Sequence, residues 1–541
     1  MIDWKTTQLP TLGPVLASPL RLTRRMFRWF SLSRFLLLAK WAAITAVCIS
    51  VLVVLLYFIE NRRAKQEWEQ IKNDLEAQGV PMDWNRNIPE PIPDEINFVL
   101  APVIAHFQYK RNNPHHVPWQ ERWGSEEDFE RLFQRNKGGV IGTESFLLRG
   151  EAIWHESRFE SHEQRRERLK SEGVAILPAE IDPWEQLENS IAPHQQLLVD
   201  LRAAARSRPK SFIEGDYTVS PLEVPIPSLS CVRNLTNLLF ADALCAIRNG
   251  DAERVFENAH TISRLGDLNP GLYFPINHMM SVVARKGFEI PIYQLALKEG
   301  LLDDSQLNRL IEESLERNAL GKFEQSMKLD IAANSEAIIS ESEVGRFLLA
   351  GSMNQSWTDR LAETFWKTVF KSMPKGWTYI MAGRSAHYMS LLLDFYDEET
   401  RMLDSETMER NRQTLGEMIR NIRFFDLLAA ITLPASNKII EQSLQLHCQQ
   451  DMLGIACALE QYRRTNGDLP EKLEALVPRF LPKLYKDPVS GENYRYERLD
   501  PQRYRLWGVG IDGKNDGGRL DTSISERDQA DVIWPLATVV R

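Results

Sequence analysis

The stretch WAAITAVCISVLVVLLYFI, which runs from Trp41 to Ile59, contains no charged side chain. As a helix rising about 1.5 Å per residue it spans roughly 28 Å, which matches the ~30 Å hydrocarbon core of a bilayer. Eleven of its residues are Leu, Ile, Val or Phe, and each of these favours membrane insertion by about 0.3–0.6 kcal/mol. The stretch therefore predicts a helix that crosses a membrane.

The flanks of this stretch favour a permanent anchor over a cleaved signal peptide. A signal peptide has a shorter apolar core that ends at small residues, whereas Glu60-Asn61-Arg62-Arg63 follows here. Six Lys and Arg residues lie between Arg21 and Lys40, against four between Arg62 and Lys72. Because the more basic flank tends to stay in the cytoplasm, we expect a single-pass protein of the inner (cytoplasmic) membrane with a cytoplasmic N-terminus and an extracytoplasmic bulk.

The basic arm has a regular spacing of its own. Arg21, Arg24, Arg25 and Arg28 stand at i, i+3, i+4 and i+7 and share one face of a helix. This pattern predicts an interfacial helix that binds anionic lipid, so that the chain contacts membrane lipid through residues 21–60. The alternative is a charge cluster that only sets the topology of the anchor.

The net charge of −9 over 541 residues, from 65 basic and 74 acidic side chains, hides an asymmetry. Residues 1–40 carry +6, so the rest of the chain carries −15. That balance argues against nucleic acid as a partner and suits divalent cations. Contents of 43% apolar and 26% charged residues are those of a globular protein, which excludes a disordered chain and a polytopic membrane protein.

The distribution of apolar residues, prolines and charges divides the chain into five segments. We expect a basic cytoplasmic arm (1–35), a transmembrane anchor (36–60), a juxtamembrane region of mixed helix and loop (61–225), a helical domain (226–435), and a long helix with a small antiparallel sheet (436–541). The predicted fold class is mainly α, with an extracytoplasmic helical bundle. Solenoid-like hairpins within that bundle are an open alternative.

Local signals place several elements inside these segments. Asn249-Gly250-Asp251 separates two amphipathic stretches and supplies a glycine stop and an aspartate cap, which predicts a helical hairpin. Ser436 is expected to cap a long helix that ends near Thr465. Short alternating runs at 494–496 and 504–507 then predict two strands.

Four cysteines lie beyond the anchor, at positions 231, 245, 448 and 457. Within each predicted helix the two cysteines cannot pair, because they are separated by about two and a half to four turns. We expect buried thiols that pack as small hydrophobic side chains. One disulfide between the two helices remains an alternative.

The motifs of common catalytic sites are missing. The chain contains no GxxxxGK[ST], GxSxG, HExxH or CxxC sequence, and we assign no catalytic residue. His155 and Glu156 precede a second His-Glu pair at His162 by seven residues, two turns of a helix. This spacing suits a metal, but in a stretch rich in Arg and Glu a solvated helix face is the simpler interpretation.

The C-terminal region carries an ordered series of motifs. They are Tyr462-Arg463, Asn466-Gly467, Pro470, Leu473-Glu474-Ala475-Leu476, Lys486-Asp487-Pro488, Gly491, Tyr494, Tyr496, Gly510, Asp512-Gly513, Gly517-Gly518 and Ala530-Asp531-Val532. The series resembles the end of the type II secretion major pseudopilins, the G-type subunits, which implies a small α+β pseudopilin-like head. The full layout, with its N-terminal anchor and helical middle, also resembles single-pass bacterial envelope proteins of uncharacterised activity.

The last loop of this region is rich in Asp and Gly. Aspartates supply the oxygen ligands that Ca²⁺ prefers, and glycines let the backbone fold around an ion. The resemblance implies calcium binding at Asp512, Asp528 and Asp531, and the spacing adds Asp516. The alternative is a glycine-rich turn with solvated aspartates.

The chain also departs from the pseudopilin pattern. No prepilin-peptidase site precedes Trp41, and the anchor lies almost 400 residues before the pilin-like helix. We therefore expect no processing or polymerisation as a pilin.

The first functional hypothesis is a membrane-anchored scaffold or interaction protein of the bacterial cell envelope, linked to secretion or envelope assembly, with envelope or secretion proteins as partners. The second is an extracytoplasmic hydrolase with a site in the helical middle or around His155 and His162. The third is a helical peptide-binding protein with a groove along residues 230–425. A deep pocket with convergent carboxylates or histidines would favour the enzyme.

Overall fold

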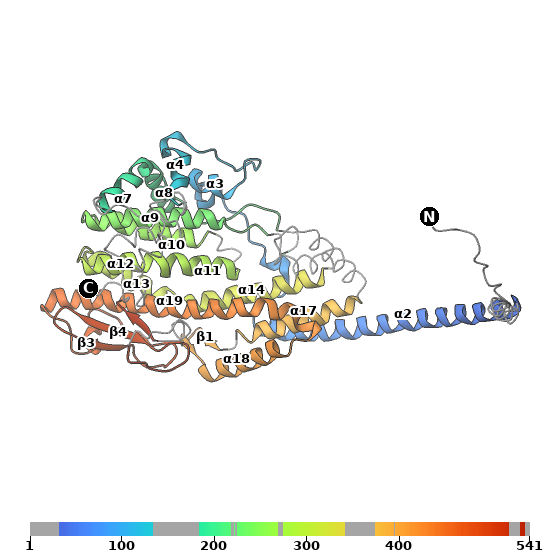
Figure 1. The fold of residues 1–541 in the computed structure, drawn as a ribbon. Coiled ribbons are helices and arrows are strands. Elements are labelled where there is room, and N and C mark those ends of the chain that lie inside the picture. Colours follow the sequence, from blue (N-terminus) through green and yellow to red (C-terminus); the bar gives the residue numbers. More distant parts are fainter. Residues whose placement is uncertain are drawn as a thin grey trace, which may run out of the picture.

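The computed structural model describes residues 32–133, 183–217, 221, 224–268, 274–340, 374–393, 395–518 and 531–535. Over these residues the protein is mainly helical, with one small sheet and one short hairpin (Figure 1). The basic arm with Arg21, Arg24, Arg25 and Arg28 lies outside the described residues.

Helix α2 (Leu32–Ala77) is a single helix of 46 residues that leaves the body of the molecule at one end (Figure 1). Its apolar part has a mean hydropathy of 2.8, and none of that part is buried inside the protein. The segment is therefore long and apolar enough to span a membrane. Beyond Asn61 the same helix enters the body, where Ala64, Trp68 and Leu75 are buried.

One helix holds the part of α2 that lies in the body, and a second helix packs on the first. Helix α17 (Lys375–Ser390) lies beside it, and α14 (Ala319–Ile339) packs on α17. Gly383 of α17 faces Trp68 and Ile71 of α2, where a Cβ atom would lie 2.8 Å from the Ile71 Cδ1. The absent side chain lets the two helices approach closely.

The other described helices, apart from α19, complete the body. They are α3 (Pro102–Gln108), α4 (Glu126–Leu132), α7 (Pro183–Ile191), α8 (Gln195–Ser207), α9 (Leu229–Arg248), α10 (Ala252–Gly266), α11 (Pro275–Ala284), α12 (Ile290–Lys298), α13 (Asp304–Glu316) and α18 (Ser405–Arg420). A π-helical turn, η9 (Arg285–Glu289), joins α11 to α12. Single 3-10 turns are η2 (Trp84–Asn87), η3 (Asp94–Ile96), η4 (Phe98–Leu100), η5 (Glu121–Trp123), η7 (Ala192–His194), η10 (Phe424–Asp426) and η11 (Leu473–Leu476).

The predicted hairpin at residues 249–251 is confirmed as the turn between α9 and α10. Gly250 has a φ of 72°, and the Asp251 side chain accepts a hydrogen bond of 3.1 Å from the backbone N–H of Arg254. Both interactions are local, which is why the sequence alone specifies this turn.

The long helix before the sheet is α19 (Leu427–Asn466), and its predicted start near Ser436 is wrong. The helix begins nine residues earlier and continues through Pro434. Ser436 is no cap, because its hydroxyl donates to the carbonyl of Thr432 one turn back, at 3.4 Å. Leu428, Ala429 and Leu433 are buried in this first part, and this packing favours the helix despite the proline.

The predicted antiparallel sheet is confirmed, and it has one strand more than predicted. Strands β3 (Arg495–Arg498), β4 (Tyr504–Gly508) and β5 (Val532–Trp534) pair in that order, with Tyr496 opposite Leu506 and Leu506 opposite Trp534. A second hairpin, β1 (Tyr396–Asp397) with β2 (Met402–Leu403), lies between α17 and α18 in the chain. The sheet and the helices share one hydrophobic core, so the C-terminal region is packed into the body.

All four cysteines beyond the anchor are buried and free, as the buried-thiol interpretation predicted. Burial raises the pKa of each of these thiols. They are unreactive packing residues in this fold.

Candidate functional site

A polar pocket of about 740 Å³ opens between α10, α11, α13, α14 and α19. Its walls carry basic, acidic and amide side chains together with two histidines. The lining includes His260, His278, Ser281, Arg285, Arg309, Glu313, Glu316, Arg317, Asn318, Lys322, Gln325, Lys328, Glu398 and Gln450. These residues are up to 190 positions apart in the chain, so only the folded protein brings them together.

Both histidines of the pocket are held neutral. Burial, with Lys322 and Arg285 nearby, lowers the pKa of His278 to about 3. Burial and the charge of Arg309 also lower the pKa of His260. Neutral imidazoles can accept or donate a hydrogen bond to a ligand at neutral pH.

His278 is fixed by a buried serine. Its Nε2 lies 2.7 Å from the hydroxyl of Ser443, and that hydroxyl donates to the carbonyl of Ile439 at 2.6 Å. Since a hydroxyl has one hydrogen, Nε2 of His278 is the donor of this pair. The serine is therefore not activated as a nucleophile.

The charged side chains of the pocket form a buried network. Arg317 donates to Glu289 at 2.6 Å and to Glu313 at 2.9 Å. Arg285 donates to Asp267 at 3.1 Å, and its charge, acting against burial, lowers the pKa of that carboxyl group. Each basic group is thus balanced by carboxylates, so the pocket is not simply cationic.

The π-helical turn gives this network its shape. Arg285 and Glu289 are its first and last residues, and both side chains are buried. π-helical turns are rare and are frequent at functional sites. Here the turn places the guanidinium of Arg285, which lines the pocket, beside the fully buried carboxylate of Glu289, with 3.7 Å between Arg285 Nε and Glu289 Oε2.

One buried polar atom of the pocket lining lacks a hydrogen-bond partner within the described part of the chain. It is Oε1 of Gln450, whose side chain is almost fully buried. Unsatisfied acceptors are costly in a protein interior. This oxygen is therefore a place where a ligand with N–H or O–H donors would gain free energy.

Arg401 connects the pocket to the C-terminal region. It has a φ of 59°, which is uncommon for a residue other than glycine. Its guanidinium donates to the carbonyl oxygens of Leu315 and Arg317, at 3.2 and 2.7 Å. It also lies 3.2 Å from Nε2 of His447 and 3.4 Å from Oδ1 of Asp451.

Asp451 is the last member of this connection. Its Oδ2 accepts a hydrogen bond of 3.0 Å from the hydroxyl of Tyr494, a residue of the pilin-like motif series. Burial raises the pKa of Asp451 to about 7, although Arg401 and Tyr494 act in the opposite direction. Through Arg401 and Asp451 the pocket and the C-terminal region therefore share one polar network.

The other motif residues that resemble pseudopilins hold the small sheet together. The Asp487 carboxylate accepts from the backbone N–H groups of Val489 at 3.0 Å and Val509 at 2.8 Å. The Tyr496 hydroxyl donates to the carbonyl of Pro470 at 2.8 Å. These contacts are structural, and the resemblance to the family stays a prediction.

The predicted calcium ligands are brought together only in part. Asp531 is buried; its Oδ2 accepts from the N–H of Gly518 at 2.8 Å, and its Oδ1 has no partner among the described residues. Burial, together with the nearby charge of Asp516, raises the pKa of Asp531, against the Gly518 hydrogen bond. Asp512 instead accepts from the N–H of Lys514, at 3.0 Å. Calcium binding at these residues stays a prediction.

Other predicted site residues cannot be placed. Asp528, His155, Glu156 and His162 lie outside the described residues. Among the residues that are described, no three His, Cys, Asp or Glu side chains gather closely enough to hold a metal ion.

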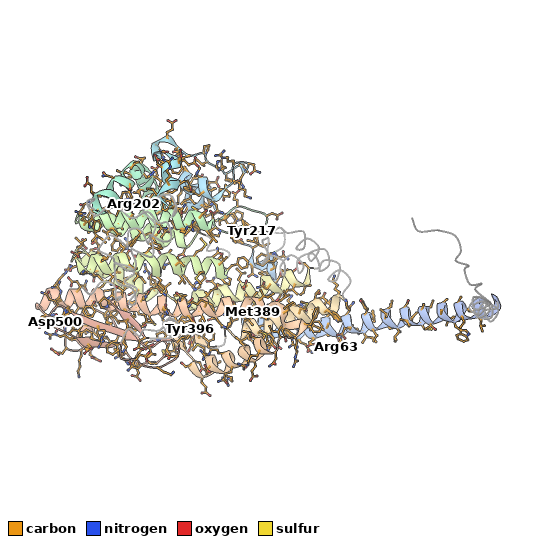
Figure 2. All side chains as sticks on the ribbon, viewed as in Figure 1. Arg63, Arg202, Tyr217, Met389, Tyr396 and Asp500 are labelled. Atoms are coloured by element: carbon orange, nitrogen blue, oxygen red, sulfur yellow. The ribbon has the colours of Figure 1, made fainter. Side chains whose placement is uncertain are left out.

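No sequence motif marks the polar pocket. Its weak signal was the i, i+4 spacing of Arg309, Glu313 and Arg317, which is also the spacing of an ordinary solvated helix face. Figure 2 shows that side chains fill the body between the helices. The same i, i+4 spacing can therefore face either solvent or another helix.

Comparisons with protein-family models, with curated proteins and with solved structures found no match for this chain.

Proposed function

We propose that this protein is a membrane-anchored scaffold of the bacterial cell envelope, which holds its extracytoplasmic body at a fixed position above the inner membrane. Its partners are envelope or secretion proteins. The observation that carries the proposal is the continuity of α2, which runs without a break from the apolar segment into the body. A flexible tether would suit an enzyme that searches for substrate, whereas an unbroken helix fixes distance and orientation.

Three contacts support a rigid connection. Oδ1 of Asn61 accepts a hydrogen bond of 2.6 Å from the N–H of Gly376, directly after the apolar segment. Trp68 and Ile71 then pack over Gly383, two turns further into the body. The connection continues through α17 to α14 and α19, which pack on α17.

The compact C-terminal region supports the same proposal. Its motif residues serve packing and hydrogen bonding, and Tyr494 reaches into the buried network of the pocket. A pseudopilin-like surface attached rigidly to an anchored body is suited to contact an assembly in the membrane plane.

Photo-crosslinking in native membranes tests the scaffold. A photoreactive amino acid is placed at Leu499 in the C-terminal region and at Val199 in α8, both exposed. We expect a discrete envelope protein to be captured from one position. A Gly-Gly-Ser-Gly insertion between Ile59 and Glu60 leaves the body intact but breaks the rigid connection, and the same capture should then weaken or shift. Capture of no envelope or secretion component from either position overturns the proposal.

The polar pocket supports a second candidate, an extracytoplasmic hydrolase. Its His260 imidazole and its carboxylates are groups that can move protons. The test uses the full chain in detergent with chromogenic esters, amides, phosphates and glycosides. A hydrolase predicts turnover that falls at least tenfold in His260→Gln, while the exposed α17 control His387→Gln keeps it. Turnover that is equal in both variants, or absent, removes this candidate. A peptide-binding groove along residues 230–425 stays a prediction.

A further inference from the structure

Four large apolar side chains that are close together in the chain are exposed on the body, namely Ile419, Ile422, Phe424 and Ile431, and we call this segment the 419–431 patch. These side chains are 37–50% exposed. They come from the last turn of α18, the link that follows it, η10 and the first turn of α19. Four large apolar side chains exposed within thirteen residues mark a contact surface more often than a solvated one.

Aromatic rings of this patch contact the start of α17. The ring of Trp377 lies 6.0 Å from that of Phe424 and 5.6 Å from that of Phe425, with interplanar angles of 69° and 88°. Trp377 follows Gly376, whose N–H is bonded to Asn61. The patch therefore sits at the end of the body where α2 leaves it.

That end lies close to the bilayer. Asn61 is two residues beyond Ile59, the last residue of the apolar segment, which places it about 3 Å further along the helix axis. The headgroup layer of a bilayer extends several ångströms beyond the hydrocarbon core. Gly376 and Trp377 thus lie at the depth of the headgroups, where tryptophan is favoured. In Figure 2 Arg63 marks this end of the body, and Asp500 marks the opposite end.

The charges around the patch suit an anionic surface. Residues 60–63, 374–377 and 417–431 contain five basic side chains, namely Arg62, Arg63, Lys375, Arg420 and Arg423. They contain three acidic ones: Glu60 forms an ion pair with Arg63, Asp426 is buried against Arg384, and Glu417 is the third, so basic side chains outnumber acidic ones five to three. Basic side chains beside an apolar patch are typical of contact with anionic phospholipid.

We propose that the 419–431 patch rests in the interfacial layer of the bilayer, beside the anchor, and that anionic phospholipid is its occupant. The body then touches the membrane at two places, the α2 helix and the patch, which fixes its tilt as well as its height. The proposal rests on the membrane anchor of the proposed function but on no protein partner.

Fluorescence quenching in vesicles tests the contact. The full chain with Cys48→Ala has no exposed cysteine among the described residues, so single cysteines can be labelled with an environment-sensitive dye. We place the label at Phe424→Cys in the patch, at Leu499→Cys as an equally exposed control at the far end, and at Val47→Cys in the anchor. The vesicles contain phosphatidylglycerol and phosphatidylcholine, with nitroxide-labelled lipid as the quencher.

We expect the label at position 424 to be quenched at least threefold more than the label at 499, and less than the label at 47. The difference should shrink when phosphatidylglycerol is left out. Equal quenching at 424 and 499, with strong quenching at 47, overturns the patch proposal and leaves the anchor intact. Weak quenching at 47 overturns the anchor and this inference with it. Efficient disulfide formation between copies through position 424 assigns the patch to a second copy of the chain and also overturns the proposal.

Discussion

The backbone N–H of Gly376 donates a 2.6 Å hydrogen bond to Oδ1 of Asn61, two residues beyond the apolar segment. A Cβ atom at position 376 would lie 2.8 Å from the Cα of Asn61 and 2.9 Å from the carbonyl oxygen of Glu60. Both neighbours are backbone atoms, so only glycine fits without a shift of one helix. This contact joins the apolar helix to the body.

Gly376→Ala should therefore loosen α17 from α2 and lower the free energy of unfolding by about 1–3 kcal/mol, because backbone atoms must move apart. Thermal unfolding of the detergent-solubilised chain, followed by circular dichroism, measures the effect. The matched control is Gly416→Ala in α18, where the nearest heavy atom, Nη1 of Arg420, is 3.8 Å from the new Cβ. The control should be neutral or stabilising by up to ~1 kcal/mol. An equal response of the two variants contradicts the close contact.

Asp451 predicts a loss of stability with rising pH. Burial raises the pKa of Asp451 to about 7, whereas an unfolded aspartate titrates near ~3.9. Between these pH values the unfolded chain has released a proton that the folded chain keeps. The contribution of Asp451 to the free energy of unfolding therefore falls as pH rises from about 4 to 7, and it is constant above that. Asp451→Asn removes this pH-dependent contribution to stability and keeps a hydrogen-bond acceptor for the Tyr494 hydroxyl. Relative to the variant, the wild type should lose on the order of 2 kcal/mol between pH 5 and 8.

The comparison with Asp451→Asn cancels the titration of all other groups, including the buried histidines. Unfolding midpoints in urea at pH 5, 6, 7 and 8 are sufficient. Parallel curves for the two proteins would show that Asp451 is ionised throughout, with Arg401 outweighing burial.

The buried imidazole of His278 predicts that stability falls as the pH is lowered, the opposite dependence to that of Asp451. Burial lowers the pKa of His278 to about 3, so the folded protein keeps a neutral imidazole while the unfolded chain takes up a proton below pH ~6.5. The contribution of His278 is complete above pH ~6.5 and is lost as pH falls toward 3. His278→Gln should flatten the decline of the melting temperature between pH 7 and 4. The exposed control His387→Gln should leave that decline unchanged, and a steeper decline in His278→Gln would contradict the burial argument.

The orphaned carboxylate oxygen of Asp531 predicts stabilisation by calcium. Millimolar Ca²⁺ should raise the melting temperature of the full chain, because a ligand that binds only the folded state adds to its stability. Asp531→Asn should abolish the rise. Glu474→Gln, which removes an exposed carboxylate from the same region, should keep it. No shift of the wild type at 5 mM Ca²⁺, or an equal shift in Asp531→Asn, removes the proposed site.

The sequence by itself determined the features that depend on neighbouring residues. The uncharged run from Trp41 to Ile59 needs only its composition to be suited to a membrane. The turn at Gly250 and Asp251 needs only a positive φ and a side-chain cap, and strands β3 and β4 need only their alternation. The burial of the four cysteines follows from their positions on amphipathic helices.

Tertiary structure decided everything that depends on distant partners. Helix α19 begins at Leu427 and not near Ser436 as predicted, because the packing of Leu428 and Leu433 outweighs the local signals of Pro434 and Ser436. Strand β5 forms because it pairs with β4, where Trp534 lies opposite Leu506. The polar pocket joins residues from five helices, and whether a charged side chain faces solvent or a buried partner is not encoded in its spacing. The physical reason is that helix periodicity fixes which residues share a face, whereas only the packed core fixes what that face meets.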